Sequence, residues 1–221
     1  CKHNTQNVCS VNIKKNCMKS YHHGNLKKEL IICACKLCEK DGYTNLSIRS
    51  LAKESGVSQS APYRHFSTKS DLYAAVAVQG FSELGKACHM DPSKKITKKK
   101  LIKTGRKYIE FGLNSANTYD LMFGTAVGSF SNYPDLLISA NATYDNFRLS
   151  FKKLANDSEE VISHKCIILW SMLHGLVGIL RKVRIAGESY KESEGPMAGA
   201  NMIAKNLDAH LDIVLTNIIK G

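Results

Sequence analysis

A short turn that contains glycine separates two short helical patterns near the start of the sequence. Residues 46–66 read LSIRSLAKESGVSQSAPYRHF. Ser47 is a candidate N-cap for a first helix over 47–54, Gly56 lies in the turn, and a second helix is expected over 58–66. Two short helices joined in this way form a helix-turn-helix, in which the second helix enters the major groove of DNA. The stretch therefore predicts a helical domain that presents its second helix to DNA.

The predicted second helix carries long polar and aromatic side chains that a packed helix would not place on its outer face. If Ser58 is the N-cap, Pro62 is the fourth helical residue, and its missing N–H forfeits only the bond to the Ser58 carbonyl. Pro62 then either stiffens the segment that meets DNA or is merely tolerated there. Arg64 can form two hydrogen bonds to guanine or hold a phosphate. The side chains predicted to meet bases or phosphates are Gln59, Ser60, Tyr63, Arg64 and His65, with Arg49 and Lys69 beside them.

Helical periodicity continues along the rest of the chain. Thr68 and Asp71 have the spacing of a capping box at the start of a long helix, and Asp91-Pro92 ends that helix. No alternation typical of a strand persists over any stretch. We therefore predict an all-α fold with further helices over 25–41, 69–89, 98–116, 119–128, 135–155, 159–186 and 196–219.

Positive charge is concentrated in the first half of the chain. Residues 1–100 contain 18 Lys and Arg against 7 Asp and Glu, whereas residues 101–221 contain 13 against 12. The net charge of +12 therefore lies almost entirely in the first half. This asymmetry favours a polyanionic partner for that half, the alternative being a lysine-rich composition spread over solvated faces.

The N-terminal segment and the cysteines indicate the compartment. Residues 1–20 contain no apolar signal region, so we interpret them as a disordered extension or as an artefact of expression or of gene-start assignment. The eight cysteines are then expected as reduced thiols in the cytoplasm. No run approaches the roughly 18 consecutive apolar residues of a membrane helix, so no membrane partner is expected. Cys33, Cys35 and Cys38 form CxCxxC, interpreted as small core residues; a redox or metal role is the alternative, and no metal or cofactor is predicted.

Three segments resemble the TetR/AcrR family of transcriptional regulators. YHHGNL at 21–26 and LSIRSLAKESGVSQSAPYRHFSTKSDL at 46–72 resemble the N-terminal domain of that family. LWSMLHGL at 169–176 resembles the Trp-x-x-x-His-Gly signature of one C-terminal branch, the WHG domain. The resemblance implies a homodimeric, usually repressing regulator. Its DNA-binding domain would span 21–73, with a fourth helix continuing to about 90, and its effector-binding and dimerisation domain would span 91–221.

The same resemblance extends the set of residues predicted to contact DNA. Ser47, Arg49 and Lys69 match flanking positions that often touch DNA in this family. The implied partner is a double-stranded operator, which is near-palindromic because a two-fold dimer reads it. The complete predicted set is Ser47, Arg49, Ser58, Gln59, Ser60, Tyr63, Arg64, His65 and Lys69.

The C-terminal half offers a dimer interface and a pocket. The helix over 159–186 is apolar nearly all round, and the helix over 196–219 repeats apolar residues at steps of three and four, so we predict a homodimer through both. His174 is either a ligand-contacting or pH-sensitive histidine or, the favoured interpretation, a hydrogen-bonded core histidine, with Gly175 allowing close helix approach. The residues predicted to bind an unknown small-molecule effector, which are otherwise plain core, are Phe111, Met122, Phe123, Phe147, Trp170 and His174.

Three classes of function were weighed. The sequence contains no GxSxG, GxGxxG, P-loop or HExxH motif, so no enzymatic activity is predicted. The leading hypothesis is a repressor that an effector releases from DNA. The alternative is an architectural protein that coats DNA without sequence preference and with strong salt dependence.

Overall fold

The computed structural model describes residues 25–155, 157–187 and 195–220, and over these residues the fold is all-α, as predicted. The predicted extension over 1–20, and the YHHG part of the segment at 21–26, lie outside the described residues. The α-helices are α1 (Leu26–Asp41), α2 (Ile48–Ser55), α3 (Lys69–Cys88), α4 (Lys98–Asn114), α5 (Ala116–Phe123), α6 (Pro134–Lys152), α7 (Glu159–Ala186), α8 (Gly195–Lys205) and α9 (Leu207–Lys220), with 3-10 helices η1 (Tyr43–Asn45), η2 (Pro62–Arg64) and η3 (Phe130–Asn132).

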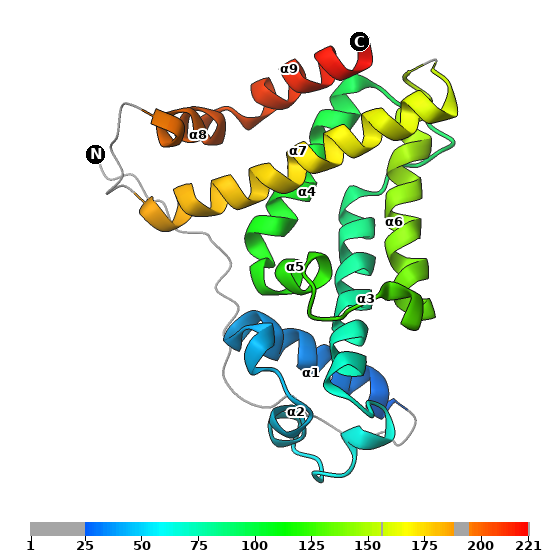
Figure 1. Ribbon diagram of the computed structural model, residues 1–221, viewed down its shortest axis with the longest axis vertical. Coiled ribbons are helices and arrows are strands. Elements are labelled where there is room, and N and C mark those ends of the chain that lie inside the picture. Colours follow the sequence, from blue (N-terminus) through cyan, green and yellow to red (C-terminus); the bar gives the residue numbers. More distant parts are fainter. Residues whose placement is uncertain (1–24, 156, 188–194, 221) are drawn as a thin grey trace, which may run out of the picture.

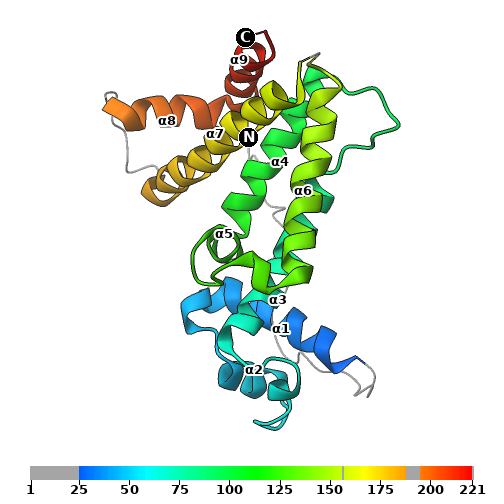
Figure 2. The same cartoon turned by 45° about the vertical axis from the view of Figure 1, so that its right-hand side comes forward.

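The helices are arranged along one long axis (Figure 1). The segment α2–η2 forms the lower end of the molecule, with α1 above it. From this end α3 runs upward and packs along α6, while α4 packs against α7 and α9. At the upper end α7 crosses the bundle, and α8 and α9 lie on its outer side (Figure 2). The long helix α3 thus joins the α2–η2 end to the bundle that surrounds α4.

Local sequence signals account for the N-terminal helices. The Ser47 side chain accepts from the Ser50 N–H, and the Thr68 side chain accepts from the Asp71 N–H, so both predicted caps are present as capping boxes. Gly56 ends α2 in the left-handed conformation, with φ of 66°. Together these signals fix where α2 and α3 begin and end. The apolar faces of the N-terminal segment meet in a shared core of Leu30, Leu37, Leu51, Phe66 and Leu72.

The predicted α-helix over 58–66 is wrong. The segment is a series of turns followed by the short 3-10 helix η2. The Ala61 N–H donates to the Ser58 carbonyl at 3.0 Å, and Pro62 has no N–H with which to form the i→i−4 bond of an α-helix. Ser58 makes no cap; its hydroxyl pairs with the Ser60 hydroxyl. Pro62 itself is buried, so it packs inward instead of stiffening an exposed end.

Two C-terminal boundaries also differ from the prediction. The single helix expected over 196–219 is divided into α8 and α9 at Asn206, whose side chain accepts from the Ala209 N–H and so competes with the helical hydrogen bonds. The helix expected over 119–128 begins three residues earlier and ends before Gly124. A Cβ on Gly124 would lie 2.5 Å from the Asp120 carbonyl oxygen, so this close approach requires glycine.

Candidate nucleic-acid interface and cavity

Side chains of α2 and η2 line a shallow depression at the lower end of the molecule, here called the α2–η2 surface. Arg49, Ser50 and Lys53 come from α2, whereas Gln59, Ser60 and Tyr63 come from the turns and η2. Tyr63 is 47% exposed, which leaves its ring facing water. The surface therefore combines two cations, several hydrogen-bonding groups and an exposed aromatic ring.

The other predicted DNA-contacting residues divide into two groups. Ser58 and Arg64 are exposed beside the α2–η2 surface, and His65 is half-buried with its ring edge against Phe66. Ser47 and Lys69 are instead engaged within the protein. The Ser47 hydroxyl caps α2, and the Lys69 ammonium donates to the Thr44 carbonyl at 3.0 Å while lying over a tyrosine ring.

Sequence reasoning missed Ser50 and Lys53. A signal for Lys53 was present, because it lies four residues after Arg49 and both side chains are exposed on α2. Ser50 is half-buried and was visible only as the third helical position of the capping box.

The basic residues of the first half of the chain lie in separate regions of the structure. Residues 25–73 carry eight Lys and Arg against five Asp and Glu. The run KKITKKK over 94–100 lies at the start of α4, where Lys98 pairs with Asp212 of α9 at 2.8 Å. This is the upper end of Figure 1, opposite α2. A large part of the positive charge therefore lies far from the α2–η2 surface.

A cavity of about 580 Å³ lies within the upper bundle. Its walls come from α3, α4, α5, α6, α7 and α9, and its lining includes no Asp, Glu, Lys, Arg or His. Asn141 and Ile167 line it and are also exposed, so the cavity reaches the surface between α6 and α7. Small-molecule sites are commonly apolar cavities of about this size with a few polar groups.

Of the six predicted ligand residues, four line this cavity. They are Met122, Phe123, Phe147 and Trp170. Phe111 is half-buried and packs on Tyr119, outside the lining. His174 is also outside the lining. Its Nδ1 pairs with the Tyr119 hydroxyl at 2.7 Å, but the residue is exposed, so the expected hydrogen bond is present and the expected core position is wrong. Two polar cavity residues of α6, Asn141 and Thr143, were not assigned from the sequence.

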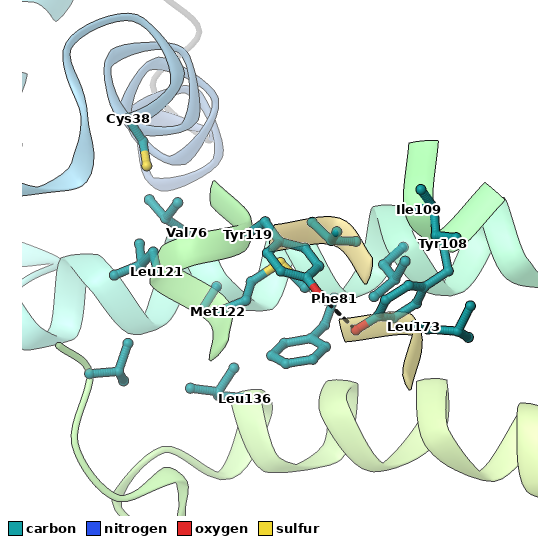
Figure 3. Close-up of a cluster of buried hydrophobic side chains, with 14 of the residues drawn as sticks. Cys38, Val76, Phe81, Tyr108, Ile109, Tyr119, Leu121, Met122, Leu136 and Leu173 are labelled. Carbon is teal, nitrogen blue, oxygen red and sulfur yellow. Dashed lines mark hydrogen bonds between the residues drawn. The ribbon is translucent and has the colours of Figure 1, made fainter. Parts of the chain in front are cut away.

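A chain of hydrogen bonds beside the cavity leads from Trp170 of α7 through α4 and α5 back to His174 of α7. The Trp170 indole N–H donates to the Tyr108 hydroxyl at 3.1 Å, and the Tyr108 and Tyr119 hydroxyls pair at 2.9 Å (Figure 3). Tyr119 continues the chain to His174. Burial raises the pKa of both tyrosine hydroxyls, so they stay protonated and act as neutral hydrogen-bonding groups.

Helix α5 connects the cavity with α1. Its Met122 and Phe123 side chains line the cavity, and Figure 3 shows Met122 near Phe81 of α3. At the start of α5, the Thr118 N–H donates to the Glu39 carboxylate at 2.6 Å, and the Asn117 side chain donates to the Glu39 carbonyl at 2.8 Å. A carboxylate at a helix N-terminus satisfies an otherwise unpaired N–H and opposes the helix dipole. One helix therefore contacts both the cavity and the α1 helix that packs on α2.

Cys35, Cys38 and Cys88 are poor nucleophiles. Burial raises the pKa of Cys35 to about 12 and that of Cys38 to about 11. Burial likewise raises the pKa of Cys88, which lines the cavity, to about 12. Since the thiolate is the reactive form, these values agree with the interpretation of the CxCxxC residues as core. Within the part of the chain that the structure describes, no group of three His, Cys, Asp or Glu side chains could hold a metal ion.

Helix α7 leaves an apolar face uncovered. Its exposed apolar side chains include Ile167, Ile168 and Ile179, and a Cβ on Gly175 would meet no atom within 4 Å. The expected close helix approach at Gly175 is therefore absent among the described residues. By length and mean hydropathy alone, 1.5 over its most apolar window, α7 also meets the criteria for a membrane span. It packs against α4, α6, α8 and α9 and forms an ion pair from Lys165 to Asp157.

The N-terminal segment matches the model of a known protein family. Residues 30–76 match the family model described as bacterial regulatory proteins, tetR family. This range contains α2, η2 and every residue of the α2–η2 surface. The chain matches no curated protein by sequence.

Solved structures share the fold over most of the chain. A protein of unknown function from Rhodococcus sp. RHA1 is 22% identical with a TM-score of 0.65, over 87% of this chain and 98% of that one. The TetR regulator SCO7222 from Streptomyces coelicolor is 14% identical with a TM-score of 0.62, over 88% and 97%. BioQ, solved with its natural double-stranded DNA operator, is 14% identical with a TM-score of 0.59, over 88% and 98%. These similarities establish the shared fold from α1 into the C-terminal helices.

Proposed function

We propose that this chain, which carries the N-terminal domain of the tetR family of bacterial regulatory proteins, is a homodimeric transcriptional repressor that a small molecule releases from its operator. The observation that carries the proposal is the α2–η2 surface, a cluster of two cations, one amide and three hydroxyls within the matched segment. A neighbour with this fold, BioQ, was solved on its operator. The proposed division is a DNA-binding domain over 21–73 and an effector and dimer domain over 91–221.

Different side chains of this surface are proposed to have different tasks on DNA. Arg49 and Lys53 are cations on the exposed face of α2 and would hold phosphates, which fixes the position of the protein without reading sequence. Gln59, Tyr63 and Arg64 would face base edges, where an Arg or Gln side chain can form two hydrogen bonds to one base. Ser47 and Lys69 would contribute less, because their side chains are already engaged within the protein.

The dimer is proposed to form through the uncovered face of α7 together with α8 and α9. Ile168 and Ile179 of α7, Met202 of α8 and Ile213 of α9 are between 46% and 68% exposed in the single chain. Apolar patches of this kind mark interaction surfaces, and a second copy offers the same patch for a two-fold interface. The Trp-x-x-x-His-Gly segment at 169–176 lies on this helix, which supports assigning the C-terminal helices to the WHG type.

Effector control is proposed to act through α5. A molecule in the cavity would press on Met122 and Phe123, and α5 holds the end of α1 through Glu39. Arg181 of α7 also binds the start of α5, donating to the Ala116 carbonyl at 3.1 Å and to Asp120 at 2.5 Å. A shift of α5 would therefore alter the position of α1 and α2 relative to α7. The effector acts only through its different affinity for the two arrangements.

The test is DNA binding by the full chain. Duplexes tiled across the DNA that flanks its gene are measured at two salt concentrations, with a scrambled duplex of equal length as competitor. We expect one near-palindromic segment to bind at least 100-fold more tightly than the scramble, as specific DNA-binding proteins do. Equal affinity for every duplex, with a steep salt dependence, would instead support the architectural alternative.

A further inference from the structure

We infer that the cavity selects an uncharged, mainly apolar molecule, and that Thr104 and Tyr108 on its α4 wall recognise one polar group of that molecule. The inference rests on the proposed function, because it names the chemical class of the effector. It follows from the composition of the lining and from the hydrogen bonds that the lining already makes.

The first step concerns charge. The lining includes no Asp, Glu, Lys, Arg or His, so a charged group inside would have no ionic partner. An unpaired charge loses its hydration on burial and is strongly disfavoured. The neighbouring cation Arg148 lies outside the lining and is already paired with Glu159 at 2.8 Å. Carboxylates and ammonium ions are therefore excluded as the buried part of a ligand.

The second step concerns the polar groups that line the cavity and already have partners. The Thr143 hydroxyl donates to the Ser139 carbonyl at 2.9 Å, and the Cys88 thiol faces the Thr104 carbonyl at 3.8 Å. The Trp170 indole has one donor, and it is used on Tyr108. These groups have no donor left for a ligand.

The third step concerns the polar groups with capacity left. Asn141 and Tyr144 of α6 also line the cavity, but they lie on the side where it opens to water, whereas Tyr108 of α4 is buried. A tyrosine hydroxyl supports three hydrogen bonds, one as donor and two as acceptor. Tyr108 uses one with Trp170 and one with Tyr119, which leaves capacity for one more. Thr104 lies four residues earlier on α4, hence on the same face, and its hydroxyl makes no hydrogen bond among the described residues. The two hydroxyls can together bind one hydroxyl or carbonyl of a ligand.

The experiment uses four ligands on one ring system. They are 1-naphthalenemethanol, 1-methylnaphthalene, 1-naphthoate and 1-naphthylmethylammonium, which are respectively a neutral alcohol, a neutral hydrocarbon, an anion and a cation. Each displaces the uncharged fluorophore N-phenyl-1-naphthylamine from the full chain at pH 7. We expect the alcohol to bind at least tenfold more tightly than either ion, and severalfold more tightly than the hydrocarbon.

Variants locate the binding and assign the polar contact. Ala140→Trp would fill the cavity and abolish fluorophore binding, whereas Ala142→Trp, on the exposed face of the same helix, would leave it unchanged. Thr104→Val with Tyr108→Phe should remove the advantage of the alcohol over the hydrocarbon and leave the affinity for the hydrocarbon within twofold. Thr104→Lys should shift the preference toward the naphthoate.

Three results would overturn the inference. They are an ion that binds as tightly as the alcohol, fluorophore binding that survives Ala140→Trp, and an alcohol preference that survives loss of both hydroxyls. Absence of fluorophore binding to a chain that still selects one duplex would also overturn it. In that case the DNA-binding part of the proposed function would stand, so the two failures are distinguishable.

Discussion

The α2–η2 surface and the cavity are opposite kinds of site. The first is exposed and carries Arg49, Lys53 and Arg64 on or beside it, whereas the second lies within the helical bundle and is lined without a single charged residue. The first comes from about fifteen consecutive residues, the second from six helices spread between Phe81 and Leu215. An exposed polar site can be read from residue types in a short segment, but an apolar site depends on which helices pack together.

The largest expected effect is on the free energy of unfolding, at the buried Phe66 that follows η2. Phe66 is 2% exposed, so Phe66→Ala leaves a cavity in the N-terminal core and should lower the free energy of unfolding by about 3–5 kcal/mol. Tyr63, three residues earlier, is 47% exposed, and Tyr63→Ala should change it by less than about 0.5 kcal/mol. Urea denaturation measures both. Equal losses would show that Tyr63 is a core residue and not a contact for DNA.

A change on the uncovered face of α7 should act on assembly. Ile168 is 57% exposed, and Ile168→Arg would place a charge in the proposed interface and raise the dimer dissociation constant by at least tenfold, or about 1.4 kcal/mol. Ile138→Arg on α6, where the isoleucine is 66% exposed, is the matched control. Sedimentation velocity over a range of concentrations distinguishes them. An unchanged Ile168→Arg dimer would place the interface elsewhere.

Loss of the α1–α5 contact should weaken the coupling between DNA binding at the α2–η2 surface and ligand binding in the cavity. Glu39→Ala removes the acceptor of the Thr118 N–H, so operator DNA and cavity ligand should affect each other less. We expect the factor by which the operator duplex weakens fluorophore binding to fall at least threefold, within the range of typical coupling energies. Glu29→Ala, on the same helix, controls for the lost charge. An unchanged factor would rule out this route.

The smallest effect concerns an ion pair at the surface. Hydrogen bonding by Lys152, with the nearby charge of Arg148, lowers the pKa of Glu159. A lowered pKa in the folded state stabilises the protein above the usual pKa of glutamate and is lost as pH falls through the lowered value. Glu159→Gln should therefore lower the melting temperature by no more than about 2 °C at pH 7, and by progressively less as the pH falls below the usual pKa of glutamate. A difference in melting temperature that does not shrink as the pH falls would mean that charge is not its cause.

Local rules predicted the parts of the fold that local chemistry determines. Ser47 and Thr68 cap the helices that their spacing indicated, and Gly56 ends α2 as expected. The same rules failed over 58–66, because tolerance of proline in a first turn was given more weight than the loss of its N–H. Asn206 was missed as a cap inside what looked like one apolar helix.

The cavity was also predicted only in part, but the reason differs from that for residues 58–66 and Asn206. Met122, Phe123, Phe147 and Trp170 were found as large apolar side chains, yet Phe111 has the same character and lies outside the lining. Which of them face the cavity depends on contacts between helices far apart in sequence. The charge asymmetry of the sequence likewise did not show where the cations lie in space. Lys98–Lys100 belong to the same basic half of the chain as Arg64 but lie at the opposite end of the molecule.

The most direct test compares DNA binding after the loss of one cation at each end of the molecule. Arg64→Ala removes a cation beside the α2–η2 surface, and Lys99→Ala removes one exposed at the start of α4. Fluorescence anisotropy with the selected duplex, at one salt concentration, gives the dissociation constant of each variant. We predict that Arg64→Ala weakens binding by at least tenfold, as expected for loss of about 1–3 kcal/mol of base contact, while Lys99→Ala stays within twofold of the unaltered protein. Equal weakening by both variants would contradict the assignment of DNA binding to the α2–η2 surface.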